Sequence, residues 1–171
     1  KREFILTSSP SMDILISSNL ERLIYLSTGC DAEANRSLME QLNTQGSYEV
    51  TETMKEAMKD FTGGFATEAE NAAEIKKVYE DTGYVIDTHT GVASAVYRAY
   101  AEKTGDTTPT VIASTASPYK FSHSVMEAIR GDEGSKDEFA IIDELCSVSG
   151  VKIPAAVEEI RNAEIRHKRE S

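Results

Sequence analysis

The sequence that decides the fold is a pair of short polar stretches, YVIDTHT at residues 84–90 and TVIASTASPYKF at residues 110–121. Their apolar beginnings, Tyr84–Ile86 and Thr110–Ala113, are rich in β-forming residues and too short for helices. Each is followed by a helical pattern, which predicts a strand–helix–strand–helix unit with parallel strands and a right-handed crossover. Such units bind ligands beyond the carboxyl ends of their strands, where the two polar turns fall.

The rest of the chain has helical periodicity. We expect helices between Ile16 and Phe61, from Thr67 to Gly83, from Asp87 to Gly105, from Ser117 to Ile129, and in two segments of the tail. The pairs Thr53–Glu56 and Thr67–Glu70 have the spacing of a capping box. The pattern predicts a helix-rich α/β fold, with a mainly helical subregion over residues 1–82 and an α/β part over residues 83–171.

The composition argues against several kinds of binding partner for this chain. The 171 residues carry a formal net charge of -11, and the basic residues are scattered, which argues against nucleic-acid binding. The longest apolar runs are too short to cross a bilayer, so we expect a cytoplasmic protein without a membrane partner. Cysteine and histidine spacings predict no metal site. Two predicted strands make a small sheet, and the chain starts at Lys1 without Met, so we expect a piece of a longer protein.

The candidate site follows from the predicted topology. If the two strands are parallel neighbours, their polar turns lie at one edge of the sheet. The hydroxyl, carboxylate and imidazole side chains of these turns then face a common crevice; they belong to Asp87, His89, Ser114, Thr115 and Ser117. A Gly-rich phosphate-binding loop and a persuasive Ser/His/Asp order are both missing from the sequence. Residue types alone therefore predict half of an α/β ligand site.

Most of these residues also have a purely structural interpretation. Asp87 and Thr88 are suitable helix caps, and capping alone explains Ser117. His89 carries protons near neutral pH or, alternatively, only supports the fold. Lys120 offers a cation to an anionic ligand or, alternatively, is simply solvated. The possibility therefore stays open that the chain is a non-catalytic α/β binding or interaction module.

A resemblance adds what these patterns do not contain. Residues 9–23, SPSMDILISSNLERL, together with the two turns, resemble the C-terminal half of bacterial threonine synthases. The matching N-terminal motif includes Ser8, Ser11 and Asn19, to which we assign no individual role. The resemblance implies a pyridoxal-phosphate enzyme of fold type II, with the parallel sheet of tryptophan synthase beta-like proteins. A sister enzyme of that fold type, acting on another amino acid, is the other catalytic alternative.

The resemblance also implies roles for particular residues. It makes the Thr115 hydroxyl the partner of the ring nitrogen of pyridoxal phosphate, and Thr115 the cofactor-binding residue of this chain. Family members often have His where Ser117 stands and Pro where Thr88 stands, so the role of that His does not carry over. The resemblance assigns no substrate-binding residue; these residues stay unknown, and Lys120 is a candidate from its place in the turn alone. No catalytic residue is expected here, because the Schiff-base lysine and the Gly-rich loop of the family are expected upstream.

The activity implied for the full-length protein is a carbon–oxygen lyase reaction of threonine biosynthesis. It converts O-phospho-L-homoserine and water to L-threonine and phosphate, with pyridoxal phosphate as cofactor. The partner of this chain is then the missing N-terminal half of the same protein, and a homo-oligomer stays open. We expect the chain alone to be inactive.

Overall fold

The computed structural model describes residues 3–131, 137–164 and 166. By their contacts these residues form two compact units, which are described separately. The first unit holds Ser11–Gly64 with the described part of Lys1–Leu6. The second holds the described part of Phe65–Ser171 together with Thr7–Pro10, a stretch that we call the docked segment.

The first unit is built from short helices. They are α1 (Ser18–Ser27), α2 (Ala32–Gln45) and α3 (Glu52–Ala57), preceded by the 3-10 turn η1 (Pro10–Met12). Helix α1 packs against α2 and α3 and buries Ile24, while Met54 is the buried side chain of α3. Many large apolar side chains of this unit stay exposed, among them Ile14, Ile16 and Leu26. The unit therefore has a small core.

Local sequence signals explain where these helices begin and end. The Asp31 carboxylate accepts from the backbone N–H groups of the first turn of α2, which ends at Gly46 with a φ of 76°. Helix α3 begins after Thr51, whose hydroxyl oxygen accepts from the Met54 N–H at 3.3 Å. The expected capping box at Thr53 is therefore wrong, because the helix has already started two residues earlier.

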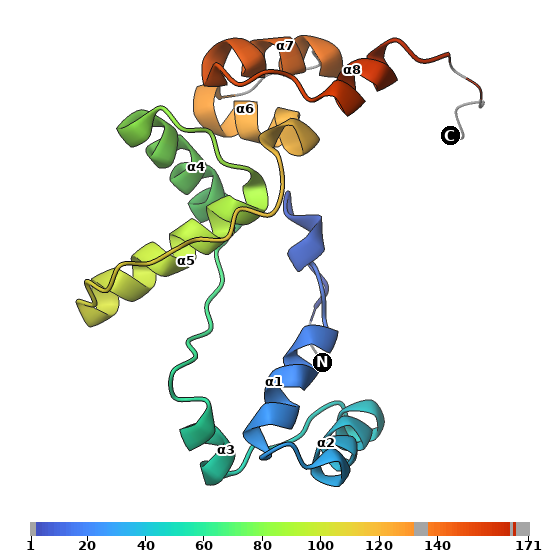
Figure 1. Ribbon diagram of the computed structural model, residues 1–171, viewed down its shortest axis with the longest axis vertical. Helices are drawn as coiled ribbons and strands as arrows, with labels where there is room; N and C mark the ends of the chain where they lie inside the picture. Colours follow the sequence, from blue (N-terminus) through green and yellow to red (C-terminus); the bar gives the residue numbers. More distant parts are fainter. Residues whose placement is uncertain (1–2, 132–136, 165, 167–171) are drawn as a thin grey trace. The chain divides into compact units, whose positions relative to one another are not determined.

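The described part of the second unit holds the main core of the chain and contains five helices (Figure 1). They are α4 (Glu68–Thr82), α5 (Thr88–Thr104), α6 (Ser122–Arg130), α7 (Glu138–Ser149) and α8 (Ala155–Arg161), with the 3-10 turn η2 (Pro118–Phe121) before α6. Helix α4 packs against α5 and α6, and α6 packs against α7. The expected capping box of Thr67 and Glu70 is confirmed at the start of α4, and Gly83 and Gly105 end α4 and α5 as expected.

The core of the second unit is a single apolar cluster. Its buried members are Ile75, Val85, Ile86, Tyr119, Val125, Met126, Ile129, Ile141, Ile142 and Leu145. The helical periodicity placed the α6 and α7 members on inward faces, and that expectation is confirmed. Val85 and Ile86 are buried, as expected for the run before the first turn. This core holds the start of α5 and the turn η2 in one rigid unit.

The two expected strands are not confirmed. Tyr84–Ile86 and Thr110–Ala113 have no regular secondary structure, and no strand occurs among residues 3–131, 137–164 and 166. A strand exists only when a neighbour supplies its ladder of backbone hydrogen bonds, and these two segments do not pair with each other. Val111 is 95% exposed, so the second segment is also not the buried run that we expected.

The two contact-based units do not follow the expected division at residues 82 and 83. Helix α4 lies in the same unit as α5 and α6 because it packs against both. As a division of a parent protein, the expected subregions 1–82 and 83–171 stay a prediction. Within the described part of the chain, every helix is too short or too polar to span a membrane.

Candidate functional site

The first polar turn is a buried cap. Asp87 is fully buried, and its Oδ1 accepts from the His89 backbone N–H at 2.9 Å. The other oxygen, Oδ2, accepts from the Thr90 hydroxyl. These bonds satisfy free N–H and O–H groups in the first turn of α5. The structure therefore confirms the capping interpretation of Asp87.

His89 is held by the same carboxylate. Its Nδ1 lies 3.2 Å from Asp87 Oδ1, and because a carboxylate only accepts, Nδ1 is the donor of this bond. The imidazole packs against Phe121, with ring centroids 4.8 Å apart. These contacts give His89 a structural role, and its role as a proton carrier stays a prediction.

Thr88 connects the first turn to a distant part of the chain. Its hydroxyl donates to the Ser8 carbonyl at 2.8 Å, which fixes the docked segment. Ser8 also donates its backbone N–H to Glu68 at 3.1 Å, and Asn71 Nδ2 lies 3.4 Å from Ser8 Oγ. Thr88 is therefore not the cap of α5: it is the first helical residue and makes a tertiary bond that a proline there would lack.

The second turn is fixed at both ends. At its start, Ser114 Oγ lies 3.1 Å from Thr90 Oγ1 of α5. At its end, the Ser117 hydroxyl oxygen accepts from the Tyr119 N–H at 3.3 Å, as expected for a cap. Tyr119 is buried in the core, where desolvation raises the pKa of its phenol, and its hydroxyl donates to the Val151 carbonyl. The turn is thus anchored through both a hydroxyl pair and a core side chain.

The second turn also carries the two residues expected to meet ligands, Thr115 and Lys120. Thr115 is exposed, and its hydroxyl has no hydrogen-bond partner among the described residues. Lys120 is also exposed, and its Nζ lies 5.4 Å from the centroid of the Phe121 ring. The structure brings Asp87, His89 and Ser114 together at the start of α5 and leaves Thr115 and Lys120 facing outward from the turn.

A half-buried ion pair between Glu74 and Arg98 connects α5 to α4. Glu74 accepts from Ser94 at 2.6 Å and from both Nε and Nη2 of Arg98 at 2.8 Å. Hydrogen bonding by the Arg98 guanidinium holds the pKa of the Glu74 carboxyl below its usual value, and the pKa of Arg98 is raised in turn. We did not predict this group from the sequence. The signal was present, since Glu74 lies beside Ile75 on the inward face of α4.

The crossing of α4 and α5 is also unusually close. A Cβ added at Gly91 would lie 2.2 Å from Asn71 Oδ1 and 2.9 Å from Ile75 Cγ1, so only glycine fits without a shift. Asn71 is almost fully buried, and its Oδ1 has no hydrogen-bond partner among the described residues. The roles of Asn71 and Thr90 were not predictable from the sequence, since a polar residue in a helix is usually solvated.

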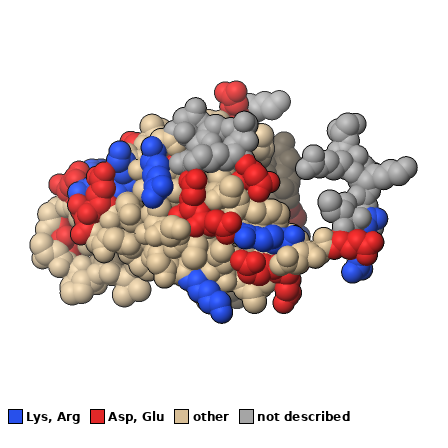
Figure 2. Space-filling view, turned by 90° about the horizontal axis from the view of Figure 1, so that it is seen from above, with Lys and Arg blue, Asp and Glu red and all other residues tan. Residues whose placement is uncertain are grey.

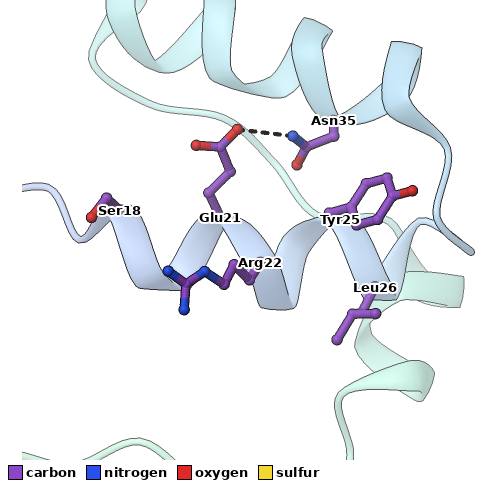
Figure 3. Close-up of a pocket in the computed structure, with 6 residues that line it drawn as sticks. All are labelled: Ser18, Glu21, Arg22, Tyr25, Leu26 and Asn35. Carbon is purple, nitrogen blue, oxygen red and sulfur yellow. Dashed lines mark hydrogen bonds between the residues drawn. The ribbon is translucent and has the colours of Figure 1, made fainter.

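Two hollows in the described part of the chain are large enough to hold a small molecule. One of about 300 Å³ lies beside the start of α5 and is lined by polar groups that include Ser8, Asn71 and Thr88. The other, of about 530 Å³, lies in the first unit between α1 and α2. Figure 3 shows Glu21 and Asn35 facing one another there, joined by a hydrogen bond of 3.0 Å. Thr88 lines the first of these two hollows, and no other residue of the two polar turns lines either of them.

The described surface has mixed charge. On the face in Figure 2, Lys and Arg side chains lie among Asp and Glu side chains, and the coloured residues form no continuous basic area. His, Cys, Asp and Glu side chains of the described ranges form no group of three or more that could hold a metal ion.

Comparisons with known proteins relate the chain to one family. Residues 90–168 match the family model described as threonine synthase, C-terminal. The threonine synthase of Saccharomyces cerevisiae is 35% identical over 92% of this chain and 35% of its own length. The threonine synthase-like 1 protein of Homo sapiens is 35% identical over 76% of this chain and 17% of its own length.

Solved structures agree with the sequence matches. The pyridoxal-phosphate-bound threonine synthase of Brucella melitensis superimposes with a TM-score of 0.70 at 38% identity, over 88% of this chain and 31% of that one. The yeast enzyme superimposes with a TM-score of 0.67 at 33% identity, over 89% and 33%. The chain thus spans about a third of the threonine synthases that it matches. Sequence and structure together show that this chain is related, over most of its length, to the C-terminal portion of threonine synthases.

Proposed function

We propose that this chain forms one wall of the cofactor site in a cytoplasmic threonine synthase. The full-length protein converts O-phospho-L-homoserine and water to L-threonine and phosphate. The observation that carries the proposal is the likeness to a pyridoxal-phosphate-bound threonine synthase, at 38% identity over 88% of the chain. The partner of this chain is the preceding part of the same protein, which supplies the Schiff-base lysine.

Thr115 is the residue proposed to hold the cofactor ring. Its hydroxyl is exposed and uncommitted among the described residues, so it is available to a ligand. The backbone next to it is fixed, because Ser114 is tied to Thr90 and Tyr119 is buried in the core. A single neutral hydroxyl, held in place at the edge of a rigid unit, fits a partner that offers one ring nitrogen. The residues present are therefore compatible with pyridoxal phosphate.

When bound, pyridoxal phosphate supplies an electron sink to the reacting substrate. The Thr115 hydroxyl donates a hydrogen bond to the ring nitrogen and keeps its own proton. Because a hydroxyl carries no charge, it favours a protonated ring nitrogen much less than a carboxylate would. Thr115 thereby sets a weaker electron sink, which is the contribution of this chain to the chemistry.

Lys120 is proposed to contact the anionic substrate. Its ammonium group is exposed on η2, three residues beyond the cap Ser117, and within the described part of the chain it lies over the Phe121 ring. A cation near the turn would attract a phosphate group by Coulomb attraction and hydrogen bonding. If so, Lys120→Gln in the full-length enzyme raises KM for O-phosphohomoserine more than it lowers kcat.

The reaction is tested by phosphate release from the full-length protein. We expect release from O-phosphohomoserine, little release from phosphoserine, and no threonine from homoserine. Preference for phosphoserine would favour a sister fold type II enzyme, and no cofactor binding at all would favour a non-catalytic module. The present chain alone should release no phosphate.

The role of Thr115 is tested in the same enzyme. Thr115→Ala should change the absorbance of the bound cofactor and lower kcat about tenfold or more, while Thr115→Ser keeps the hydroxyl and most of the activity. Thr107→Ala is the matched control, because Thr107 is an exposed threonine of the same connection. An unchanged spectrum and rate in Thr115→Ala would refute the ring-nitrogen role.

A further inference from the structure

We propose that Thr90 is a positioning residue that holds Thr115 in place through a hydroxyl relay from Ser114 to Asp87. The inference rests on the proposed role of Thr115 at the cofactor ring. Thr90 itself is buried in the first turn of α5, where its hydroxyl is bonded to Asp87 and paired with Ser114. It therefore acts on the site indirectly, through the backbone that carries Thr115.

The direction of the relay follows from counting protons. Thr90 has a single hydroxyl proton, and the Asp87 carboxylate beside it can only accept, so that proton is donated to Asp87 Oδ2. Thr90 Oγ1 is then the acceptor for Ser114, whose hydroxyl oxygen lies 3.1 Å away. Asp87 is locked in turn by the His89 backbone N–H at 2.9 Å. The relay runs from an exposed turn to a fully buried carboxylate.

This relay is the main tertiary bond of the connection between α5 and η2. Among the described residues, the other hydrogen bonds of residues 106–117 are made to residues at most six positions away. The connection also lacks the strand pairing that would hold such a segment in a sheet. The placement of Ser114, and of the next residue, Thr115, consequently depends on Thr90.

The far end of the turn has its own attachment to α5. Phe121 packs against His89, one residue before Thr90, with centroids 4.8 Å apart. Consecutive residues of α5 thus hold both ends of the turn that carries Thr115. Losing the Thr90 bond frees one end only, so we expect Thr115 to be displaced while the unit stays folded.

The test uses the full-length enzyme with its cofactor. Thr90→Val keeps the shape of the side chain and removes the relay, so the absorbance of the bound cofactor should shift in the same direction as in Thr115→Ala. We expect kcat to fall about tenfold to a hundredfold with little change in KM, as for small displacements of a positioned group. Thr90→Ser retains the hydroxyl and should restore both. In the double variant Thr90→Val/Thr115→Ala, the fold-decrease in kcat should be smaller than the product of the decreases in the two single variants.

Thr88→Val is the matched control for burial. Thr88 is equally buried in the same helical turn, but its hydroxyl reaches the docked segment and not the second turn. It should lower stability and leave the cofactor absorbance unchanged. An equal spectral shift in Thr88→Val would show a merely structural effect and would overturn the inference.

Ser114→Ala removes the same relay at its exposed end, where we expect little loss of stability. It should reproduce the Thr90→Val spectrum, and this variant decides the question if Thr90→Val does not fold. If Thr115→Ala alters the cofactor spectrum while both Thr90→Val and Ser114→Ala leave it unchanged, the inference fails and the proposed function stands. If Thr115→Ala itself has no effect, the proposed role of Thr115 fails, and this inference fails with it.

Discussion

The two polar turns of the second unit are opposites in burial and bonding. In the first, Asp87, Thr88, His89 and Thr90 are all buried, and their polar groups bond to one another, to Ser8 or to Ser114. In the second, residues 113–115 are exposed, and the fixed points lie at its ends. Buried polar groups destabilise a fold unless they are paired, so the polar groups of the first turn serve to stabilise the fold. The second turn has exposed polar groups that are available to a ligand.

This difference distinguishes a structural role for the first turn from a ligand-facing role for the second, whereas the sequence pattern predicted one role for both. We expected five side chains of both turns to face one crevice. The structure instead places Asp87 and His89 within the scaffold and leaves Thr115 on the surface. Substitutions in or behind the buried first turn should therefore cost more stability than substitutions in the exposed second turn, and four substitutions test this, from the largest expected effect to the smallest.

Asp87→Ala should be the most damaging change. It leaves three buried donors without their acceptor, so we expect the free energy of unfolding to fall by about 3 kcal/mol or more. Urea denaturation of the full-length protein measures this loss. Ser114→Ala, at the exposed turn, is the comparison and should lose far less. Similar losses in both variants would remove the distinction between a supporting and a presenting turn.

Gly91→Ala should cost about 2–3 kcal/mol, because the added methyl group would lie 2.2 Å from a buried side-chain oxygen. Gly63→Ala is the matched control, since its Cβ would meet nothing within 4 Å. Thermal denaturation of both full-length variants gives the difference. A tolerated Gly91→Ala would mean that α4 and α5 can separate, and that the buried turn is less rigid than its contacts indicate.

Glu74→Gln should cost about 1–2 kcal/mol at pH 7, because it weakens the bonds from Arg98 and Ser94 behind the first turn. The pKa of Glu74 is lowered from 4.5 in the folded protein, so its contribution is complete above that value and is lost as the pH falls through the folded pKa. Denaturation measured across pH should therefore show the wild type and the variant converging below about pH 4.5.

Lys77→Ala is the control for that experiment. It breaks an exposed ion pair with Asp81 on the same helix, so it should change stability little at any pH. A gap between wild type and Glu74→Gln that persists at acid pH would show that packing, and not the ionised carboxylate, accounts for the loss.

Ser117→Ala should have the smallest effect. It removes one cap bond from a short 3-10 turn at an exposed position, which is worth about 0.5–1 kcal/mol. Hydrogen exchange at the Tyr119 amide measures the loss directly. The buried Tyr119 side chain should hold the turn in place, so a large loss of stability would contradict the double anchoring described above.

Local signals in the sequence predicted most helix boundaries. Thr67 with Glu70, Gly83 and Gly105 act through bonds or backbone angles within a few residues of a helix end, and such short-range signals can be recognised in the sequence. The capping box at Thr53 was misplaced because Thr51 is an equally good cap two residues earlier.

Partners distant in the sequence were not predictable in this way. The expected strands need neighbours that the pattern cannot supply, and none is found in the described ranges. The bond from Thr88 to Ser8 spans 80 residues, and the hydroxyl pair of Thr90 and Ser114 spans 24. The positions of the two turns were thus predictable from the sequence. That the first turn is buried and the second exposed was not predictable.

The docked segment has a consequence for biosynthesis. Thr7–Pro10 leaves the ribosome long before Glu68, Asn71 and Thr88, which are the residues that bind it. At about 5–20 residues per second, this four-residue stretch waits several seconds before its receptor is complete. Ser11–Gly64, the main part of the first unit, is synthesised during that delay, so the second unit is completed only when a loop of this length has been closed.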